Sequence, residues 1–510
     1  MPDMITYTTP IPFLAVLVSL AAVPLIMWSG EKRRNLREFW TLIAAVIKFL
    51  LVLSLVPAAL DGKAAEWVIV TISPGIDLRL AVDYAGLFFA LVSSGLWILT
   101  SFYSIGYVRG SKEHKQTRYF ASFAICLSST IGIAFSANLL TFVFFYEILS
   151  LATYPLVIHK ENAEAKKSGR QYLTYALSAG LLLIIGTGWT WVMAGTTEFQ
   201  PGGFLGGILT DPWAAKALFF MLFTGVGVKA GIMPLQSWLP AAMVAPTPVS
   251  ALLHAVAVVK SGVFGVVRMA GFVFGPEVMQ QFGLHYILAT FAAVTIIVAS
   301  LIAMRQDNLK RRLAYSTVGH LSYIVLGVAL MTPDGFMGGL LHLANHATTK
   351  ITLFFCAGAI YVNMHRTEIS QLNGIGKAMP WTMGAFTIGS MGLAGVPPIN
   401  AFISKFFLCQ GAMQADSLLL LSVFLLSGVL NMAYFFPIVR RAFFKKGDEE
   451  VAHHGEASPL MVVPICIVAL LSIILGLYPN AGVHFFDLAT RITAGVMETA
   501  GSVSVAGLIP

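Results

Sequence analysis

The chain has 510 residues, of which 57% are hydrophobic and 11% are charged, and its formal net charge is +8. Its mean hydropathy is +0.80. Soluble chains carry roughly 25% charged residues, so this composition excludes an ordinary soluble protein and indicates that most of the chain contacts lipid. The four cysteines show neither CxxC spacing nor metal-ligand spacing, and the sequence has no glycine-rich phosphate loop. We therefore expect no cofactor and leave open whether a metal binds.

Fourteen apolar runs are each long enough to cross a bilayer as a helix, which takes about 20 residues. We predict an all-α, polytopic membrane protein with about fourteen transmembrane helices. The runs lie near residues 11–29, 40–60, 83–105, 119–137, 139–158, 171–195, 214–239, 249–273, 285–304, 312–331, 338–363, 380–412, 418–439 and 459–478.

Two of these runs contain interior prolines, the seventh at Pro234 and the twelfth at Pro397 and Pro398. Proline removes a backbone donor and clashes with the preceding turn, so helices 7 and 12 are expected to break into half-helices. Broken helices in corresponding positions are typical of inverted repeats around an ion path, here two repeats of five helices. The predicted parts are helices 1–3 (residues 1–118), helices 4–8 (119–273), helices 9–13 (274–445), and a cytoplasmic loop with helix 14 and an outer tail (446–510).

The basic residues are unevenly distributed over the connections. Connections after odd-numbered helices contain 22 Lys and Arg, whereas the other connections and both tails contain only Lys63, Arg79 and Arg491. By the positive-inside rule, the first set is cytoplasmic and both termini lie on the outer side of the cell inner (plasma) membrane. Topology then accounts for the net charge, so no nucleic-acid partner is expected.

Five ionisable residues lie deep inside apolar runs: Glu147, Lys229, Lys260, Lys350 and Lys405. A lysine at a helix centre costs about 2.5–3.5 kcal/mol on insertion, so each needs a partner or a function. Glu147 is the only acid expected at such depth, and Lys229 is its natural partner. Lysine suits proton transfer because, unlike arginine, it can lose its proton. A static ion pair that only fixes helix packing is the alternative to a contact that opens and closes with proton transfer.

Three further cations, Lys48, Lys216 and Arg268, are close enough to helix ends for their side chains to reach the headgroups. We expect them to lie at the membrane surface and to play no part in transport.

Four histidines, His254, His320, His342 and His346, lie in predicted helices 8, 10 and 11. Neutral imidazole can take up a proton on one nitrogen and release it from the other, so with the lysines they suggest a relay. His342, His346 and Lys350 are each four residues apart and share one helical face, whereas His254 and Lys260 are six apart and need water between them. Each histidine alone is also compatible with a hydrogen-bonded packing role.

The segment Val228–Phe264, VKAGIMPLQSWLPAAMVAPTPVSALLHAVAVVKSGVF, resembles the signature of the proton-conducting membrane transporter family. That family comprises the antiporter-like subunits of respiratory complex I, of membrane-bound hydrogenases and of Mrp-type cation/proton antiporters. The resemblance covers roughly residues 80–445. Further matches are Phe145–Glu147, Lys310–Thr317, His346–Lys350, Gly395–Pro398 and Phe402–Phe406.

The resemblance implies the fourteen-helix inverted-repeat fold and membership of a multi-subunit complex. It also implies that Glu147 and Lys229 form a switching ion pair, that Lys260 is the connecting lysine, and that Lys405 is the exit-side lysine of the second half-channel. The nearest complex I relatives tend to have Glu at the last position, so Lys405 makes the chain most similar to the D-type subunits of Mrp antiporters.

The leading hypothesis is a proton-translocating subunit of an Mrp-type Na⁺(K⁺)/H⁺ antiporter, with related antiporter-like and small membrane subunits as partners. The alternative is a proton-pumping membrane subunit of a complex I-like NADH–quinone oxidoreductase or of a membrane-bound hydrogenase. A third possibility is coupling to a hydration enzyme for inorganic carbon uptake. The sequence has no redox or hydrolytic site of its own, so it leaves open whether the complex is an enzyme, which cation crosses, and what drives the protons.

Overall fold

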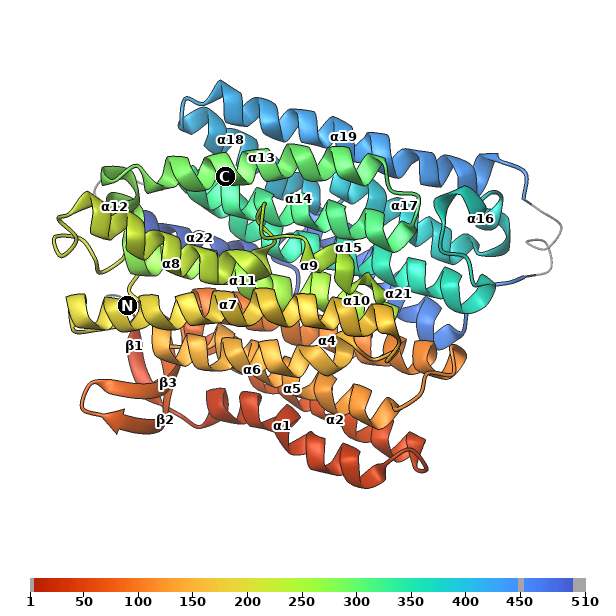
Figure 1. Ribbon diagram of the computed structural model, residues 1–510, viewed down its shortest axis with the longest axis horizontal. Coiled ribbons are helices and arrows are strands. Elements are labelled where there is room, and N and C mark those ends of the chain that lie inside the picture. The colour runs from red at the N-terminus through yellow and green to blue at the C-terminus, as the bar shows by residue number, and fades with distance from the viewer. Residues whose placement is uncertain (1–3, 448–453, 499–510) are drawn as a thin grey trace.

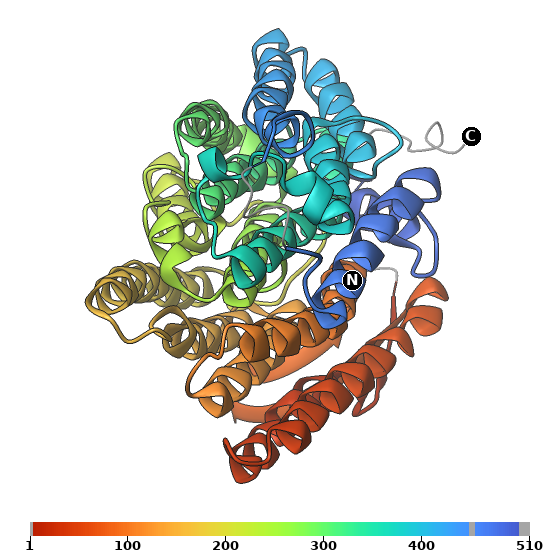
Figure 2. The same cartoon turned by 90° about the vertical axis from the view of Figure 1, so that its right-hand side faces the viewer.

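The structure, a computed structural model, describes residues 4–447 and 454–498. Its long helices lie along one common direction and form a single bundle (Figures 1 and 2). Ten helices in the described part are long and apolar enough to cross a membrane. The four remaining predicted crossings are less apolar or interrupted, and they correspond to α5 (Gln116–Ala134), α14 (Leu309–Ala329), α15 (Pro333–Met364), and α17 (Pro380–Ala394) with α18 (Ala401–Gln414). The chain is a polytopic helical membrane protein, as predicted.

The N-terminal region contains a small sheet that the sequence did not predict. β1 (Ile5–Thr8) pairs in parallel with β2 (Lys63–Ser73), and β2 pairs antiparallel with β3 (Ile76–Val82). The β2–β3 hairpin lies at one end of the bundle, at the left of Figure 1. The adjoining helices are α1 (Ile11–Ser29), α2 (Arg34–Leu53) and the short α3 (Val56–Leu60), so the run predicted at 40–60 divides in two.

The next helices are α4 (Tyr84–Gly110), α5, α6 (Leu139–Val157), α7 (Ala163–Ala194) and α8 (Pro212–Ala230). α7 begins earlier than predicted because the Asn162 side chain accepts a hydrogen bond from the Ala165 amide and caps the helix. α8 ends at Gly231, whose φ of 70° is easily adopted only by glycine. The short α9 (Trp238–Ala241) follows, so the seventh helix is broken as predicted.

The eighth crossing is wholly buried at the centre of the bundle. It follows a 3₁₀ turn (Ala242–Val244) and consists of α10 (Thr247–Ala251), a π-helical turn (Leu252–Val256), α11 (Val258–Arg268), a second π-helical turn (Met269–Phe274) and α12 (Gly275–Gln281). π-Helical turns inside helices occur frequently at functional sites, because they change the direction in which side chains point.

The second half contains α13 (Leu284–Met304), α14, α15, a 3₁₀ turn (Ile369–Gln371), α16 (Ile375–Ala378), α17, α18 and α19 (Leu418–Phe444). α17 ends at Gly395, with φ 93°, and α18 begins after a loop, so the twelfth helix is also broken as predicted. The last described helices are α21 (Pro459–Leu477) and α22 (Phe485–Met497). α22 packs against α4 and α15, with Leu488, Ile492 and Val496 buried.

The two sets of helices correspond to each other closely. α6 and α14 begin directly after capping asparagines, Asn138 and Asn308, and each asparagine forms an isolated antiparallel bridge, to Glu198 and Glu368 respectively. Asn308 lies 170 residues after Asn138, and Glu368 lies 170 residues after Glu198. α7 and α15, which lie between these positions, have 32 residues each. The repeat is therefore visible in helix lengths and caps, although the side chains along it differ.

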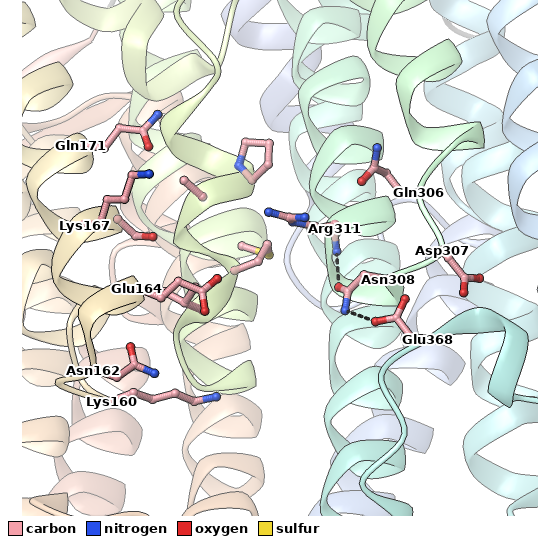
Figure 3. A pocket seen from close by; sticks show the side chains of 15 residues that line it. Lys160, Asn162, Glu164, Lys167, Gln171, Gln306, Asp307, Asn308, Arg311 and Glu368 are labelled. Atoms are coloured by element: carbon pink, nitrogen blue, oxygen red, sulfur yellow. Dashed lines mark hydrogen bonds between the residues drawn. The ribbon is translucent and has the colours of Figure 1, made fainter.

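The two sets also run in opposite directions. Lys160 and Asn162, at the end of α6 and the start of α7, form one wall of a polar pocket, and Asn308 and Glu368 lie in the opposite wall (Figure 3). The last turn of α6 thus lies at the same end of the bundle as the first turn of α14. This end contains the connections that the charge pattern predicts to be cytoplasmic.

Candidate functional site

Lys229 lies in the last turn of α8, two residues before the helix breaks, and is 1% exposed. Its Nζ donates to the Tyr146 carbonyl at 2.7 Å and lies 3.3 Å from the centroid of the Tyr146 ring. The Tyr146 hydroxyl donates in turn to the Gly225 carbonyl at 3.1 Å, which ties α6 to α8. A carbonyl and an aromatic face are both favourable partners for a buried ammonium group.

Glu147 is the next residue of α6 after Tyr146, and its carboxylate faces α7. The carboxylate packs against Gly180, where an added Cβ would overlap it. Its Oε1 is buried and has no hydrogen-bond partner in the part of the chain that the structure describes. Over the same residues no ion pair within 4.0 Å joins Glu147 to Lys229. Lys229 contacts the residue directly before Glu147, and the switching contact itself stays a prediction.

Glu147 is not the most deeply buried acid, contrary to the sequence-based expectation. It is half-buried, whereas Asp83 and Asp334 are 5% and 4% exposed. Both aspartates lie at helix ends, where sequence alone indicates access to water. Burial there is produced by neighbouring helices that lie far away in the sequence.

Lys260 connects the two halves of the bundle. It is fully buried in α11, and its Nζ lies 2.9 Å from Nδ1 of His346 in α15. On the other side, Gly262 allows α11 to approach α8 closely, since a Cβ there would lie only 2.8 Å from the Cβ of Lys229. One stretch of α11 therefore lies between the first broken helix and the histidines of α15.

Three of the four predicted relay histidines form one cluster. His320 Nδ1 lies 3.1 Å from His342 Nε2, and the ring centroids of His320 and His346 are 5.4 Å apart. His342 Nδ1 lies 2.9 Å from the Ser404 hydroxyl in α18. All three rings are at most 1% exposed. The cluster extends from Lys260 to the second half of the broken twelfth helix.

Lys350 begins a second hydrogen-bonded chain. Its Nζ donates to the Ser316 hydroxyl at 2.7 Å, and the Ser316 hydroxyl lies 3.0 Å from that of Tyr434 in α19. The Tyr434 hydroxyl donates to the Asn431 side-chain oxygen. His342, His346 and Lys350 lie on one face of α15, as predicted, and the face is buried along its length.

Lys405 lies at the far end of that chain. Its Nζ donates to the Leu393 carbonyl at 2.5 Å, and the Asn431 amide donates to the same carbonyl at 3.1 Å. This carbonyl is in the last turn of α17, where the break at Gly395 leaves carbonyls without helical partners. The Lys405 ammonium also lies 5.1 Å from the centroid of the Tyr323 ring. Lys350 and Lys405 are thus linked through Ser316, Tyr434, Asn431 and one backbone oxygen.

His254 does not join either chain. It is fully buried in the first π-helical turn, its ring lies 4.9 Å from that of Phe354, and neither ring nitrogen has a hydrogen-bond partner among the described residues. A role for His254 in the relay stays a prediction.

Two of the three cations expected at the membrane surface are buried instead. Arg268 is 1% exposed and forms a two-pronged ion pair with Asp83, in which Nη2 donates to Oδ1 at 2.7 Å. Lys48 is fully buried 4.7 Å from the centroid of the Trp97 ring. Only Lys216 remains as expected, with its Nζ 5.7 Å from the ring of Trp213, which is 79% exposed. The expectation failed for Arg268 because its partner precedes it by 185 residues.

The polar pocket in Figure 3 has a volume of about 680 Å³ and lies between the two sets of helices. Lys167 and Gln171 of α7 line one side, and Arg311 of α14 lines the other. The Gln171 amide donates to the Ser237 hydroxyl at 3.1 Å, and Ser237 lies in the loop where the seventh helix is broken. The pocket also borders α9, the short helix that follows the break, through Pro240 and Ala241.

The sequence did not point to Ser316, Tyr434, Asn431 or Ser404 as members of the network. Single hydroxyl and amide side chains in apolar helices are common packing residues, and nothing in their spacing distinguishes them. Of these four residues, Asn431 could have been singled out from the sequence, because an amide inside a bilayer-spanning run needs a hydrogen-bond partner.

A bundle with two oppositely directed repeats, a broken helix in each and buried lysines joined by polar side chains defines an ion-translocating type of membrane protein. The chain belongs to the NADH:quinone oxidoreductase/Mrp antiporter transmembrane family, whose family model matches residues 136–431.

Its relatives come from several kinds of complex. The chain is 30% identical to NADH-quinone oxidoreductase subunit N of Desulforudis audaxviator, over 76% of this chain and 81% of the relative. It is 30% identical to hydrogenase-4 component B of Escherichia coli, over 79% and 62%. It is 27% identical to a probable K⁺/H⁺ antiporter protein of the A/B type from Rhizobium meliloti, over 93% and 48%. The chain thus spans about half to two thirds of the last two, which are longer proteins.

Two solved structures share the fold over nearly the whole chain. One is an archaeal respiratory membrane complex, the membrane-bound sulfane sulfur reductase, with TM-score 0.86 and 23% identity over 96% of this chain and 99% of that one. The other is the Mrp complex from Dietzia sp. DQ12-45-1b, with TM-score 0.84 and 19% identity over 96% and 97%. Both neighbours are parts of multi-subunit membrane complexes.

Proposed function

We propose that the chain is a proton-translocating, antiporter-like subunit of a multi-subunit Mrp-type Na⁺(K⁺)/H⁺ antiporter. The observation that carries this proposal is the hydrogen-bonded series from Lys350 through Ser316, Tyr434 and Asn431 to the Leu393 carbonyl and Lys405. A purely structural bundle has no need for two lysines joined in this way, because an apolar residue at either position would avoid the cost of a buried charge.

Lys350, Ser316 and Tyr434 can pass a proton directly, because lysine releases and takes up a proton and hydroxyls donate and accept hydrogen bonds at once. Asn431 and the Leu393 carbonyl position Tyr434 and Lys405 next to each other, and the transfer between these two is proposed to pass through water.

The histidine cluster offers a parallel route from Lys260 to Ser404, since each neutral ring has one donating and one accepting nitrogen. His346 and His320 are not hydrogen-bonded to each other, so this step of the route is proposed to pass through water. The two routes end on consecutive residues of α18, Ser404 and Lys405.

In the first half, Lys229 and Glu147 are proposed to form the switch. Lys229 is held by the carbonyl of Tyr146, directly before Glu147, and the carboxylate has an oxygen without a partner in the described structure. Rotation about the lysine side chain is proposed to move the ammonium group from the Tyr146 carbonyl to the Glu147 carboxylate. Closing that contact favours the charged lysine and opening it favours proton release toward Lys260.

The proposed orientation places both termini outside the cell and the polar pocket on the cytoplasmic side, as the distribution of basic residues predicts. The pocket then supplies protons or water from the cytoplasm to the side of the first broken helix. Na⁺ or K⁺ is the proposed counter-ion, and the assignment to the D type of Mrp subunits rests on Lys405 alone.

A redox-driven complex is the second candidate, because the relatives include components of a quinone oxidoreductase and of a hydrogenase. In that case the same lysines move protons, and electron transfer in partner subunits drives them. Purification of the complex from its native membrane distinguishes the two: flavin or iron–sulfur subunits that co-purify with this chain support the redox reading.

Transport assays test the proton route itself. In everted vesicles that contain the whole complex, Lys229→Ala and Glu147→Ala are expected to abolish Na⁺- or K⁺-dependent dissipation of ΔpH, whereas Lys216→Ala leaves it unchanged. Gly180→Ala displaces the Glu147 carboxylate without removing it and is expected to lower the rate. Gly188→Ala, on the same helix with open space around it, is the matched control. Normal transport by assembled Lys229→Ala and Glu147→Ala complexes overturns the proposal.

A further inference from the structure

A compact group of metal-ligand side chains lies outside the membrane-spanning helices. Glu113 and His114 are in the connection between α4 and α5, and His159 follows the end of α6. One ligand atom from each of the three residues lies within 4.8 Å of the others. They belong to none of the proton routes described above.

The geometry of the group is close to that of a metal site. Glu113 Oε2 lies 3.7 Å from His159 Nε2, and the two imidazole rings stack with their centroids 5.1 Å apart. Ligand atoms bound at 2.0–2.1 Å in a tetrahedral zinc site are about 3.3 Å from one another. Shifts on the order of 1 Å in side chains therefore suffice to bring all three atoms onto one ion.

His159 provides an independent indication of a ligand. Its side chain is fully buried, yet neither ring nitrogen has a hydrogen-bond partner among the residues that the structure describes. Buried polar groups are nearly always satisfied, so a ring with two free nitrogens calls for an unseen partner. Burial, together with nearby His114 and Arg118, lowers the pKa of His159 to about 4. The ring is thus neutral at pH 7, which is the form that binds metal.

Of the cations around the group, Lys310 donates to the Ala245 carbonyl at 2.6 Å, and Lys160 lies 5.9 Å from the centroid of the Tyr361 ring. Lys115 and Arg118 both bind Glu161, at 2.8 Å and 2.5 Å. Their charge is thereby compensated by a carboxylate outside the three-residue group. The Glu113 carboxylate is available to bind a metal ion: it faces His159, and its side chain is 11% exposed.

We propose that Glu113, His114 and His159 bind a divalent transition-metal ion, with Zn²⁺ preferred, and that water fills a fourth position. Two imidazoles and one carboxylate are a typical donor set for zinc, whereas Mg²⁺ and Ca²⁺ prefer oxygen ligands only. The bound ion joins the α4–α5 connection to the segment that leads into α7. His159 directly precedes Lys160, so the ion also fixes one wall of the polar pocket.

Cobalt titration of the purified full-length complex in detergent tests the proposal. The sequence also contains His453 and His454 in a polar loop, so both are first replaced by Asn to remove adventitious binding. One equivalent of Co²⁺ is expected to give the intense visible absorption of a tetrahedral site, and Zn²⁺ is expected to displace it. Calorimetric titration with ZnCl₂ gives the affinity.

Glu113→Gln, His114→Ala and His159→Gln are each expected to weaken Zn²⁺ binding by at least about tenfold. His365→Asn, in an exposed connection at the end of α15, is the matched control and is expected to have no effect. His114 is half exposed, so its replacement leaves the fold intact and keeps the test valid if His159→Gln fails to assemble. Unchanged Zn²⁺ affinity in His114→Ala and Glu113→Gln, or only a weak octahedral Co²⁺ spectrum, overturns the proposal.

Discussion

Lys260 Nζ in α11 and His346 Nδ1 in α15 lie 2.9 Å apart, fully buried, where the two repeats of the bundle meet. Their hydrogen bond directly links the central crossing of the first half to the histidine cluster of the second. The proposed proton path changes from one half to the other at this point.

Replacement of His346 therefore tests whether the halves are connected. His346→Ala is expected to lower ΔpH-coupled transport by about a hundredfold or more, the lower range for losing one proton-transfer group. His254→Ala is the comparison, because that buried ring has no hydrogen-bond partner in the described structure although the sequence predicts it in the relay. A rate within about twofold of the unmodified complex would exclude His254 from the relay, and a loss equal to that of His346→Ala would place it there.

The Tyr434 hydroxyl is predicted to be important for the hydrogen-bonded series from Lys350 to Lys405. Tyr434→Phe keeps the ring but removes the link between Ser316 and Asn431, so transport is expected to fall severalfold. Tyr103→Phe, the control, removes a buried hydroxyl that donates to the Phe355 carbonyl outside the series, so its effect is expected to be small. Everted-vesicle assays at matched protein levels measure both. A fully active Tyr434→Phe complex would direct the path through the histidines alone.

The ion pair between Asp83 and Arg268 is predicted to be a major stabilising contact. Asp83→Asn leaves a buried guanidinium group without its counter-charge, and breaking such a pair costs about 3–5 kcal/mol. Asp83 also caps α4 through the Gly86 amide at 2.7 Å, and Asn retains that function, so the loss reports on charge. Chemical unfolding in detergent measures it. The double variant Asp83→Leu/Arg268→Met should recover part of the stability lost in Asp83→Asn. If Arg268 were exposed at the surface, the double variant would recover none.

Stability is expected to fall on mild acidification because of His159. Its pKa is about 4 in the folded protein, below the ordinary value of 6.5, so the unfolded chain binds more protons between these two values. The folded state is therefore stabilised fully above about pH 6.5 and loses this contribution as the pH falls toward 4. Thermal melting across this pH range measures the effect. EDTA in the buffer keeps any bound metal from contributing. His159→Gln should flatten the pH dependence, and an unchanged slope would contradict the assignment.

The approximate positions of the crossing helices could be predicted, because a run of apolar residues long enough to cross a bilayer has few alternatives to a helix. The two breaks at Gly231 and Gly395 followed from the nearby prolines for the same local reason. The shared face of His342, His346 and Lys350 followed from helical periodicity.

Contacts between distant segments could not be predicted. Arg268 appeared free to reach the headgroups, since nothing local reveals Asp83. The β2–β3 hairpin was missed because its residues form a short polar–apolar connection rather than a spanning run. Ser316 and Tyr434 could be recognised as part of the network only from the fold, which brings the Ser316 hydroxyl of α14 within hydrogen-bond distance of both Lys350 and Tyr434.

The acceptor for Lys405 is a main-chain oxygen, that of Leu393, and the acceptor for Lys229 is the main-chain oxygen of Tyr146. Any amino acid at position 393 or 146 supplies the same oxygen, so no point mutation can delete it. Natural sequence variation at position 393 is then unconstrained by the contact with Lys405, whereas position 146 also supplies the aromatic ring against Lys229. A mutational scan read only through side chains would leave both backbone acceptors undetected. Backbone ester substitution, which weakens a carbonyl as an acceptor, is the kind of chemical change able to reveal them.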